Sequence, residues 1–289
     1  MEQPVSLIEW HHAGGSFLWR GHDIFVRTGG ADDRPALVLI HGFPSASHDW
    51  HPLWDTLCRD FRVIALDMIG FGFSDKPADA DYSIQTQASL VETLMRALEL
   101  EDVTLLVHDY GNTVAQELLA RHLEGSLHVS LKGICFLNGG LFPETHRPVM
   151  AQRLLISPLG GLFARFISFE KLSRNFRHVC SDALPEDDLL AFWALLEHNN
   201  GRRVMPKLIR YMVERRQFRE RWVGALQNSN IPLRLIDGLD DPVSGAHMVA
   251  RYRELITDAD VVELEGIGHY PQLEAPEQVL RAFLSWAGQ

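Results

Sequence analysis

Short runs of apolar residues, rich in Val, Ile and Leu, recur along the chain between polar and turn-forming residues. Eight of these runs have the length and composition of buried β-strands. They are residues 16–20, 23–27, 36–40, 62–66, 103–107, 133–137, 233–237 and 261–265. The first two runs predict a hairpin because only Gly21 and His22 separate them. The others predict a mostly parallel sheet, since helix-like stretches alternate with them.

Amphipathic stretches between the strands have the pattern of helices that cover both faces of such a sheet. They are residues 50–59, 85–100, 112–122, 244–257 and 276–287. Between residue 140 and about residue 228 the strand pattern is absent and amphipathic helical sequence replaces it. The prediction is an α/β fold with a core of residues 1–140 and 229–289 and an inserted helical cap of residues 141–228. The alternative for the insertion is an extra stabilising layer that plays no part in ligand binding.

Composition narrows the function classes. The chain has 289 residues, of which 46% are hydrophobic, and a formal net charge of −11. With no long basic run, nucleic acid and anionic membranes are expected to be poor partners. No segment approaches the length of a membrane span, and the first residues lack a signal-peptide pattern. Three widely spaced cysteines fit no metal-binding pattern and favour a reduced, cytoplasmic setting.

The most informative stretch is residues 105–116, where a buried strand changes abruptly into a small-residue turn and then a helix. This pattern predicts an elbow that lifts the side chain of Asp109 above the sheet edge as a nucleophile. A carboxylate can attack a saturated carbon to form an alkyl ester, whereas attack on an ester carbonyl would give a labile anhydride. The alternative is that Asp109 only caps a helix that begins near Asn112.

Two further polar groups follow later strands. Asp241 comes after the seventh predicted strand and His269 after the eighth, which gives the order nucleophile, acid, base along the chain. Asp240 competes with Asp241 for the role of orienting the histidine, and Asp241 is favoured. Asn138, at the end of the sixth strand, cannot carry a negative charge and so cannot be the acid.

The loop of residues 41–44, His-Gly-Phe-Pro, follows the third predicted strand. We expect its Phe43 N–H, together with the Tyr110 N–H, to form an oxyanion hole beside Asp109. An ordinary Gly-Pro turn is the alternative. Trp50 follows closely and is a candidate pocket residue, although a position at a helix start against the core explains it equally well.

These residues resemble the α/β-hydrolase superfamily, and within it the aspartate-nucleophile branch that contains epoxide hydrolases and haloalkane dehalogenases. The elbow, the 41–44 loop and residues 70–77, Gly-Phe-Gly-Phe-Ser-Asp-Lys-Pro, carry the resemblance. Within the branch, the chain resembles epoxide-hydrolase-like members of the mesoderm-specific transcript type. That likeness runs through residues 108–111, 114–119, 138–148, 221–226 and 269–274.

The resemblance implies further site residues. Epoxide hydrolases share the His-Gly-Phe-Pro loop and protonate the epoxide oxygen with tyrosines of the cap. Tyr211 matches the second of these tyrosines, and the first has no counterpart here. His146 and Tyr110 are candidates for a second donor, although a cap-entry turn and packing at a helix start explain them as well. Dehalogenases of this branch place Trp after the nucleophile and often Asn in the first loop, where this chain has Tyr110 and Phe43.

The expected activity is therefore hydrolysis through an alkyl-enzyme ester, most simply of an epoxide to a diol. The expected partners are a small, mostly apolar electrophile and water, and no metal or organic cofactor is needed. A haloalkane dehalogenase or another α/β hydrolase is the alternative, and a binding protein that has kept the fold without turnover is the third possibility. A homodimer is compatible with the sequence.

Overall fold

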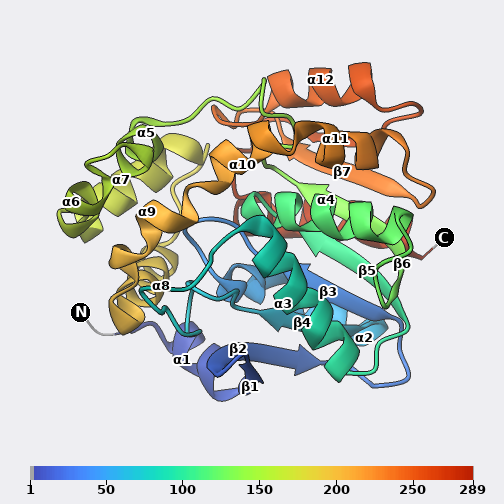
Figure 1. The fold of residues 1–289 in the computed structure, drawn as a ribbon, viewed down its shortest axis with the longest axis horizontal. Coiled ribbons are helices and arrows are strands. Elements are labelled where there is room, and N and C mark those ends of the chain that lie inside the picture. The colour runs from blue at the N-terminus through green and yellow to red at the C-terminus, as the bar shows by residue number, and fades with distance from the viewer. Residues whose placement is uncertain (1–2, 289) are drawn as a thin grey trace.

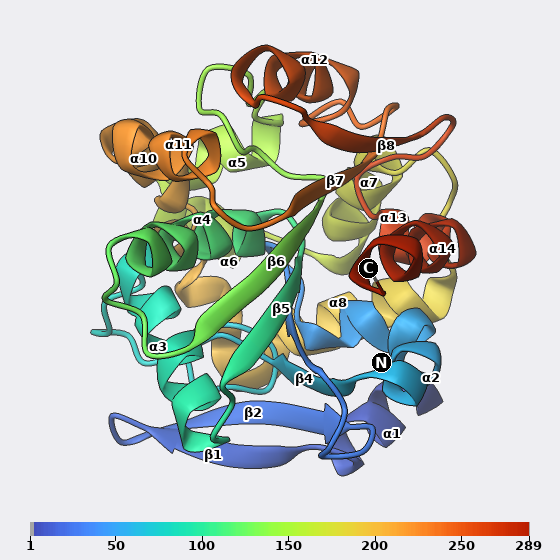
Figure 2. The same ribbon diagram turned by 90° about the vertical axis from the view of Figure 1, so that its right-hand side faces the viewer.

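A computed structural model describes residues 3–288 of the chain. Its strands form one sheet with the order β1-β2-β4-β3-β5-β6-β7-β8 (Figures 1 and 2). β1 and β2 form an antiparallel hairpin, β2 is antiparallel to β4, and all later neighbours are parallel. The strands are β1 (Gly15–Trp19), β2 (His22–Gly29), β3 (Ala36–Ile40), β4 (Arg62–Leu66), β5 (Asp102–Val107), β6 (Ser130–Leu137), β7 (Leu233–Gly238) and β8 (Asp260–Leu264). The predicted eight-stranded, mostly parallel α/β fold is confirmed.

Helices cover both faces of this sheet (Figure 2). One face carries α3 (Ile84–Ala97), α4 (Tyr110–Leu123) and α12 (Ala246–Leu255), and the other carries α2 (His51–Asp60) and α14 (Pro276–Ala287). Successive residues of a strand point to opposite faces. Accordingly, Val38 and Ile40 of β3 belong to the first core, and Leu37 and Leu39 belong to the second.

Some boundaries differ from the prediction. Helix α1 (Val5–His12) was not predicted, because only Leu7 and Trp10 of its eight residues are buried and the pattern is too short to recognise. Its Trp10 indole N–H donates to Ser47 Oγ over 3.2 Å. A 3₁₀ turn, η1 (Ser47–Trp50), precedes α2, and a short helix, α13 (Pro271–Glu274), follows β8. Helix α4 begins at Tyr110, two residues before the predicted start.

The segment between β6 and β7 is helical. Residues 138–232 all lie in the described part of the chain and none of them forms a strand. The helices are α5 (Met150–Ile156), α6 (Gly160–Arg165), α7 (Phe169–Val179), α8 (Glu186–Glu197), η2 (His198–Arg203), α9 (Met205–Leu208), α10 (Tyr211–Gln217) and α11 (Arg219–Gln227). Figure 1 shows α5, α6 and α7 at the outer end of this segment, whereas α10 and α11 run alongside α4. Within residues 3–288, no helix combines the length and apolarity needed to cross a membrane.

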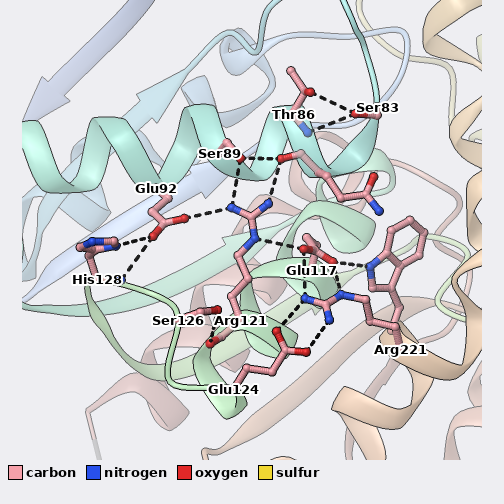
Figure 3. A network of polar contacts seen from close by, with 12 residues as sticks. Ser83, Thr86, Ser89, Glu92, Glu117, Arg121, Glu124, Ser126, His128 and Arg221 are labelled. Carbon is pink, nitrogen blue, oxygen red and sulfur yellow. Dashed lines mark hydrogen bonds and ion pairs between the residues drawn. The ribbon is translucent and has the colours of Figure 1, made fainter.

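Helix α11 is fastened to α4 by a buried carboxylate (Figure 3). Glu117 of α4 accepts hydrogen bonds from Arg121, from both Nε and Nη2 of Arg221, and from the Trp222 indole, at 2.7–3.2 Å. Arg121 reaches on to Glu92 of α3. Because a buried charge is tolerated only when it is paired and hydrogen-bonded, this network fixes the end of the helical insertion on the core.

Candidate active site

The elbow predicted at Asp109 is present between β5 and α4. Asp109 has φ 44° and ψ −99°, a conformation that non-glycine residues rarely adopt. Two glycines make room for it: a Cβ on Gly111 would lie 2.4 Å from the Ile40 carbonyl oxygen, and one on Gly139 would lie 2.6 Å from Asp109 Cα. Asp109 occupies the N-cap position of α4, but its side chain makes no capping hydrogen bond. The helix-cap alternative therefore does not account for its carboxylate.

One predicted oxyanion donor contacts that carboxylate. The Phe43 N–H donates to Asp109 Oδ2 over 3.0 Å. His41 holds this loop in place, since its Nδ1 bonds the Gly42 carbonyl and its Nε2 accepts the Met68 N–H. For the second predicted donor, the Tyr110 N–H, the structure of residues 3–288 contains no corresponding bond. Oδ2 is thus held by the loop, whereas Oδ1 accepts no hydrogen bond in the described chain and lies 3.9 Å from Arg215 Nη2.

The predicted acid and base are in contact. His269 Nδ1 lies 2.7 Å from Asp241 Oδ2, which fixes the ring so that its Nε2 is the free nitrogen. Asp241 also accepts bonds from the Ser244 hydroxyl at 2.6 Å and the Val243 N–H at 2.7 Å. The side chain of Asn138 donates to Asp241 Oδ2 over 3.2 Å and to the Gly238 carbonyl. Asp240 is exposed, so Asp241 is the residue placed to orient the histidine.

The charges around His269 set its protonation. Burial lowers the pKa of His269, but the carboxylate of Asp241 and, more weakly, that of Asp109 outweigh burial and raise it to about 9. Burial also opposes the charge on Asp241, yet His269, Ser244 and the Val243 N–H together lower the pKa of Asp241 to about 2. The pair is therefore an imidazolium and a carboxylate at neutral pH.

Tyr211 and Arg215 lie next to Asp109 on α10. Arg215 donates from Nη2 to the Asp109 carbonyl at 3.0 Å and from Nε to Thr113 Oγ1 at 2.7 Å, and Nη2 is 3.9 Å from Asp109 Oδ1. Its guanidinium stacks on the Tyr211 ring at 4.5 Å. The Tyr211 hydroxyl is buried without a hydrogen-bond partner in the described chain. Burial and the nearby Asp109 charge raise the pKa of Tyr211, so this hydroxyl keeps its proton.

Arg215 was missed by the sequence analysis, although a signal for it existed. Side chains four residues apart share a face of an α-helix, so Arg215 lies on the face that carries Tyr211. An arginine on an amphipathic helix is usually solvated, whereas this one is buried beside a second charge.

Three other predicted residues have mixed outcomes. His146 lies beside Arg215, with both ring nitrogens buried and unpartnered in the described chain, and burial followed by the Arg215 charge lowers the pKa of His146 to about 3. The Tyr110 hydroxyl points away from Asp109 and donates to the Tyr82 carbonyl over 3.3 Å, which fits packing at a helix start. Trp50 is fully buried in the core beneath α2, so the structure gives no support to a substrate-binding role for it.

An apolar pocket opens between the helical insertion and the sheet edge, with about 700 Å³ of empty space. Phe43, His269 and Tyr270 form part of its wall, so the pocket reaches the candidate base, whereas Asp109 does not line it. The lining is otherwise mainly aliphatic and aromatic, with polar side chains at Gln152, Lys171 and Asn175. Tyr211, Trp50 and His146 do not line it.

Tyr270 is a second residue that the sequence analysis missed. It directly follows His269, and its ring lies 5.2 Å from that of Phe176 on the pocket wall. Burial and the charges of Asp49 and Asp109 raise the pKa of Tyr270. Two protonated phenols, Tyr211 and Tyr270, therefore lie within the electrostatic reach of Asp109. Among residues 3–288, no group of three or more His, Cys, Asp or Glu side chains is arranged to hold a metal ion.

Comparison with known proteins gives the class. A family model for the α/β hydrolase fold matches residues 35–276, so the chain belongs to this family. The mesoderm-specific transcript protein of Mus musculus is 41% identical over 293 residues, which cover 97% of this chain and 88% of that protein. LipZ of Mycobacterium tuberculosis is 40% identical over 284 residues, which cover 97% of each. A haloalkane dehalogenase loop variant from Bradyrhizobium elkanii has a TM-score of 0.79 at 23% identity, over 95% of this chain and 96% of that chain, a likeness of fold alone. The predicted resemblance is confirmed, and the chain is an α/β hydrolase.

Proposed function

We propose that this hydrolase uses Asp109 as its nucleophile, forms an alkyl-enzyme ester, and most readily opens epoxides to vicinal diols. One observation carries the proposal: the elbow carboxylate does not cap α4 but is bonded through Oδ2 to the Phe43 N–H. This leaves Oδ1 available for attack beside an apolar pocket. The substrate class follows from the nucleophile, since a carboxylate displaces at saturated carbon.

In the first step, Asp109 Oδ1 attacks a ring carbon of the epoxide and the bond from that carbon to the ring oxygen breaks. Tyr211 or Tyr270 donates the proton that the ring oxygen takes up. A phenol whose pKa is raised by burial is a weak acid, so its donation is concerted with ring opening rather than a separate ionisation. The apolar lining excludes water from the carbon under attack.

In the second step, water attacks the carbonyl carbon of the ester and the bond from that carbon to Oδ1 breaks, so that Oδ1 leaves with the diol. Alkylation removes the Asp109 charge, which is one of the charges that raise the pKa of His269. The imidazolium therefore gives its proton to the tyrosinate left by ring opening, and the neutral His269 Nε2 then accepts a proton from the attacking water, with Asp241 stabilising the imidazolium that results. The Phe43 N–H stabilises the oxyanion, and the diol leaves with Asp109 ionised and His269 protonated as at the start.

The trapping variant His269→Gln tests this scheme. It retains the nucleophile and loses the base, so the ester should accumulate and be visible by intact-protein mass spectrometry after exposure to panels of epoxides and haloalkanes. The expected result is a mass increase equal to one whole epoxide, mapped by proteolysis to Asp109. The double variant Asp109→Asn/His269→Gln is the control and should gain no mass.

Other outcomes select the alternatives. Addition of an alkyl group with release of halide would identify a dehalogenase that uses the same nucleophile. An adduct on any other residue would contradict the role of Asp109. A ligand that raises the melting temperature without being consumed by the unmodified protein would favour the non-catalytic binding alternative.

A further inference from the structure

Two helices of the insertion have apolar side chains on both sides. Leu155 of α5, with Phe163 and Ile167 in and after α6, faces the pocket. Nine large apolar side chains are exposed within residues 3–288, and five of them lie on or beside the outer side of these same two helices. Those five are Met150, Leu154, Leu159, Leu162 and Phe166. A group of exposed apolar side chains this close together is typical of a contact surface, and this one has no partner in the isolated chain.

Cations surround these side chains although the whole chain is acidic. Residues 150–179 contain five Lys or Arg and a single acidic residue, against a net charge of −11 for the chain. Arg153 and Arg165 are exposed on α5 and α6, and Arg174 and Arg177 are exposed on α7. Leu162 and Arg165 also line a surface hollow together with Arg202 and Arg203 of η2. The exposed apolar and basic residues thus belong to the same helices, α5, α6 and α7, which lie at the outer end of the insertion (Figure 1).

We propose that this apolar–basic face, formed by the five exposed apolar residues and the cations of α5, α6 and α7, docks on the surface of an anionic phospholipid bilayer. Leu and Phe side chains would enter the acyl region, and the exposed arginines would meet lipid phosphates, as in interfacial amphipathic helices. The inner sides of α5, α6 and α7 line the apolar pocket, so docking would place the pocket wall against the lipid.

Charge favours this occupant over a second copy of the chain. A two-fold symmetric contact places the same face on both partners, so the cations of one copy would oppose those of the other. An anionic lipid surface instead complements them. The net charge of −11 predicts that anionic membranes are poor partners. The local cations of this face, rather than the charge summed over the chain, would meet the lipid.

The test is vesicle flotation of the full chain with phosphatidylcholine alone and with phosphatidylcholine mixed with phosphatidylglycerol. The expected result is binding to the anionic vesicles that weakens as salt rises. Leu162→Glu/Phe166→Glu should reduce this binding by about tenfold or more, because it puts two charges where apolar side chains would insert. Leu18→Glu is the control, because Leu18 on β1 lies outside the proposed face and is 69% exposed, against 54% for Leu162 and 62% for Phe166. The Leu18→Glu variant should bind the anionic vesicles as well as the unmodified chain does.

A second variant tests the role of charge. Arg174→Gln/Arg177→Gln should weaken binding to anionic vesicles at low salt and reduce its salt dependence. The proposal is overturned if the unmodified chain floats with neither vesicle, or if Leu162→Glu/Phe166→Glu binds as well as Leu18→Glu. It is also overturned if sedimentation without lipid shows a dimer that Leu162→Glu/Phe166→Glu abolishes, since a second copy would then cover the face.

Discussion

Helix α4 has two buried carboxylates, and their surroundings are opposite. Glu117 accepts hydrogen bonds from Arg121, Arg221 and Trp222, so both of its oxygens are satisfied (Figure 3). Asp109, at the start of the same helix, accepts one side-chain bond, from the Phe43 N–H, and has Arg215 at 3.9 Å. Buried polar atoms near Asp109 have no partner in the described chain: the Tyr211 hydroxyl, both ring nitrogens of His146, and Arg215 Nη1.

The difference is the one expected between a structural carboxylate, Glu117, and the proposed nucleophile, Asp109. Burial opposes the charge of Glu117, but bonds from Arg221, Trp222 and Arg121 more than compensate and lower the pKa of that carboxyl. Native proteins leave few buried polar groups unpaired, so a cluster of them marks a place where the fold is not optimised for stability alone. The two sites are linked, because the Glu117 network anchors α11, which directly follows the helix that holds Tyr211 and Arg215 beside Asp109.

The largest expected effect is on activity at Asp109. Asp109→Asn removes the proposed nucleophilic oxygen and should reduce turnover of an epoxide substrate by about 10³-fold or more. Because the amide oxygen can still accept the Phe43 N–H, the melting temperature should change by only a few degrees. Steady-state diol formation and thermal unfolding measure the two effects. Substantial turnover by the variant, checked by mass spectrometry for deamidation back to Asp, would contradict the nucleophile assignment.

At Glu117 the main expected effect is on stability. Glu117→Gln replaces a carboxylate that pairs with two arginines by a neutral group with one acceptor, and should lower the free energy of unfolding by about 2–4 kcal/mol. Urea unfolding measures the loss. Glu124→Gln is the matched control: Glu124 also pairs with Arg221, but its side chain is 52% exposed, so the loss should be about 0.5 kcal/mol or less. Equal losses for the two variants would remove the contrast between the carboxylates.

The sequence predicted the parts of this arrangement that depend on regular patterns. Strands β3 and β4 were predicted at their observed bounds, because their continuous apolar runs are buried on both faces of the sheet. The residues that follow strands were placed together at one sheet edge, since parallel strands end at the same side. Asp241 and His269 meet there for that reason.

The site residues that the sequence pattern did not predict are positioned by tertiary packing. An arginine inside a helical stretch reads as a solvated residue, and only the tertiary structure turns Arg215 toward Asp109. Trp50 follows the 41–44 loop closely in sequence, yet the 3₁₀ turn η1 directs it into the opposite core. Tyr270 gave no separate signal, because its place on the pocket wall is set by helices of the insertion that pack against it.

A smaller effect is expected at the two phenols. Tyr211→Phe and Tyr270→Phe each remove one possible proton donor, and each should reduce epoxide opening by about 10–100-fold. Tyr252→Phe is the matched control, because Tyr252 on α12 is equally buried and its hydroxyl also has no partner in the described chain. Single-turnover measurements of ester formation separate this step from hydrolysis. If all three variants behave alike, the hydroxyls near Asp109 have no role in ring opening.

The smallest expected effect is a dependence of stability on pH, which has opposite signs at His269 and at Glu117. Because the folded-state pKa of His269 is raised from its ordinary value of about 6.5 to about 9, the His269–Asp241 pair stabilises the fold fully below about pH 6.5 and loses this contribution as pH rises through about 9. The lowered pKa of Glu117 acts oppositely: the stability that Glu117 contributes is present above its ordinary pKa and is lost only as pH falls below it.

His269→Gln should therefore destabilise the protein by roughly 1–3 kcal/mol in mildly acidic buffer and by less as pH rises toward 9. The destabilisation by Glu117→Gln should be the same in mildly acidic buffer and near pH 9. Urea unfolding of both variants and the unmodified protein at each pH measures this. A His269→Gln effect that does not change with pH would mean that Asp241 and Asp109 do not hold a proton on His269, and the proposed release of that proton on alkylation would lose its foundation.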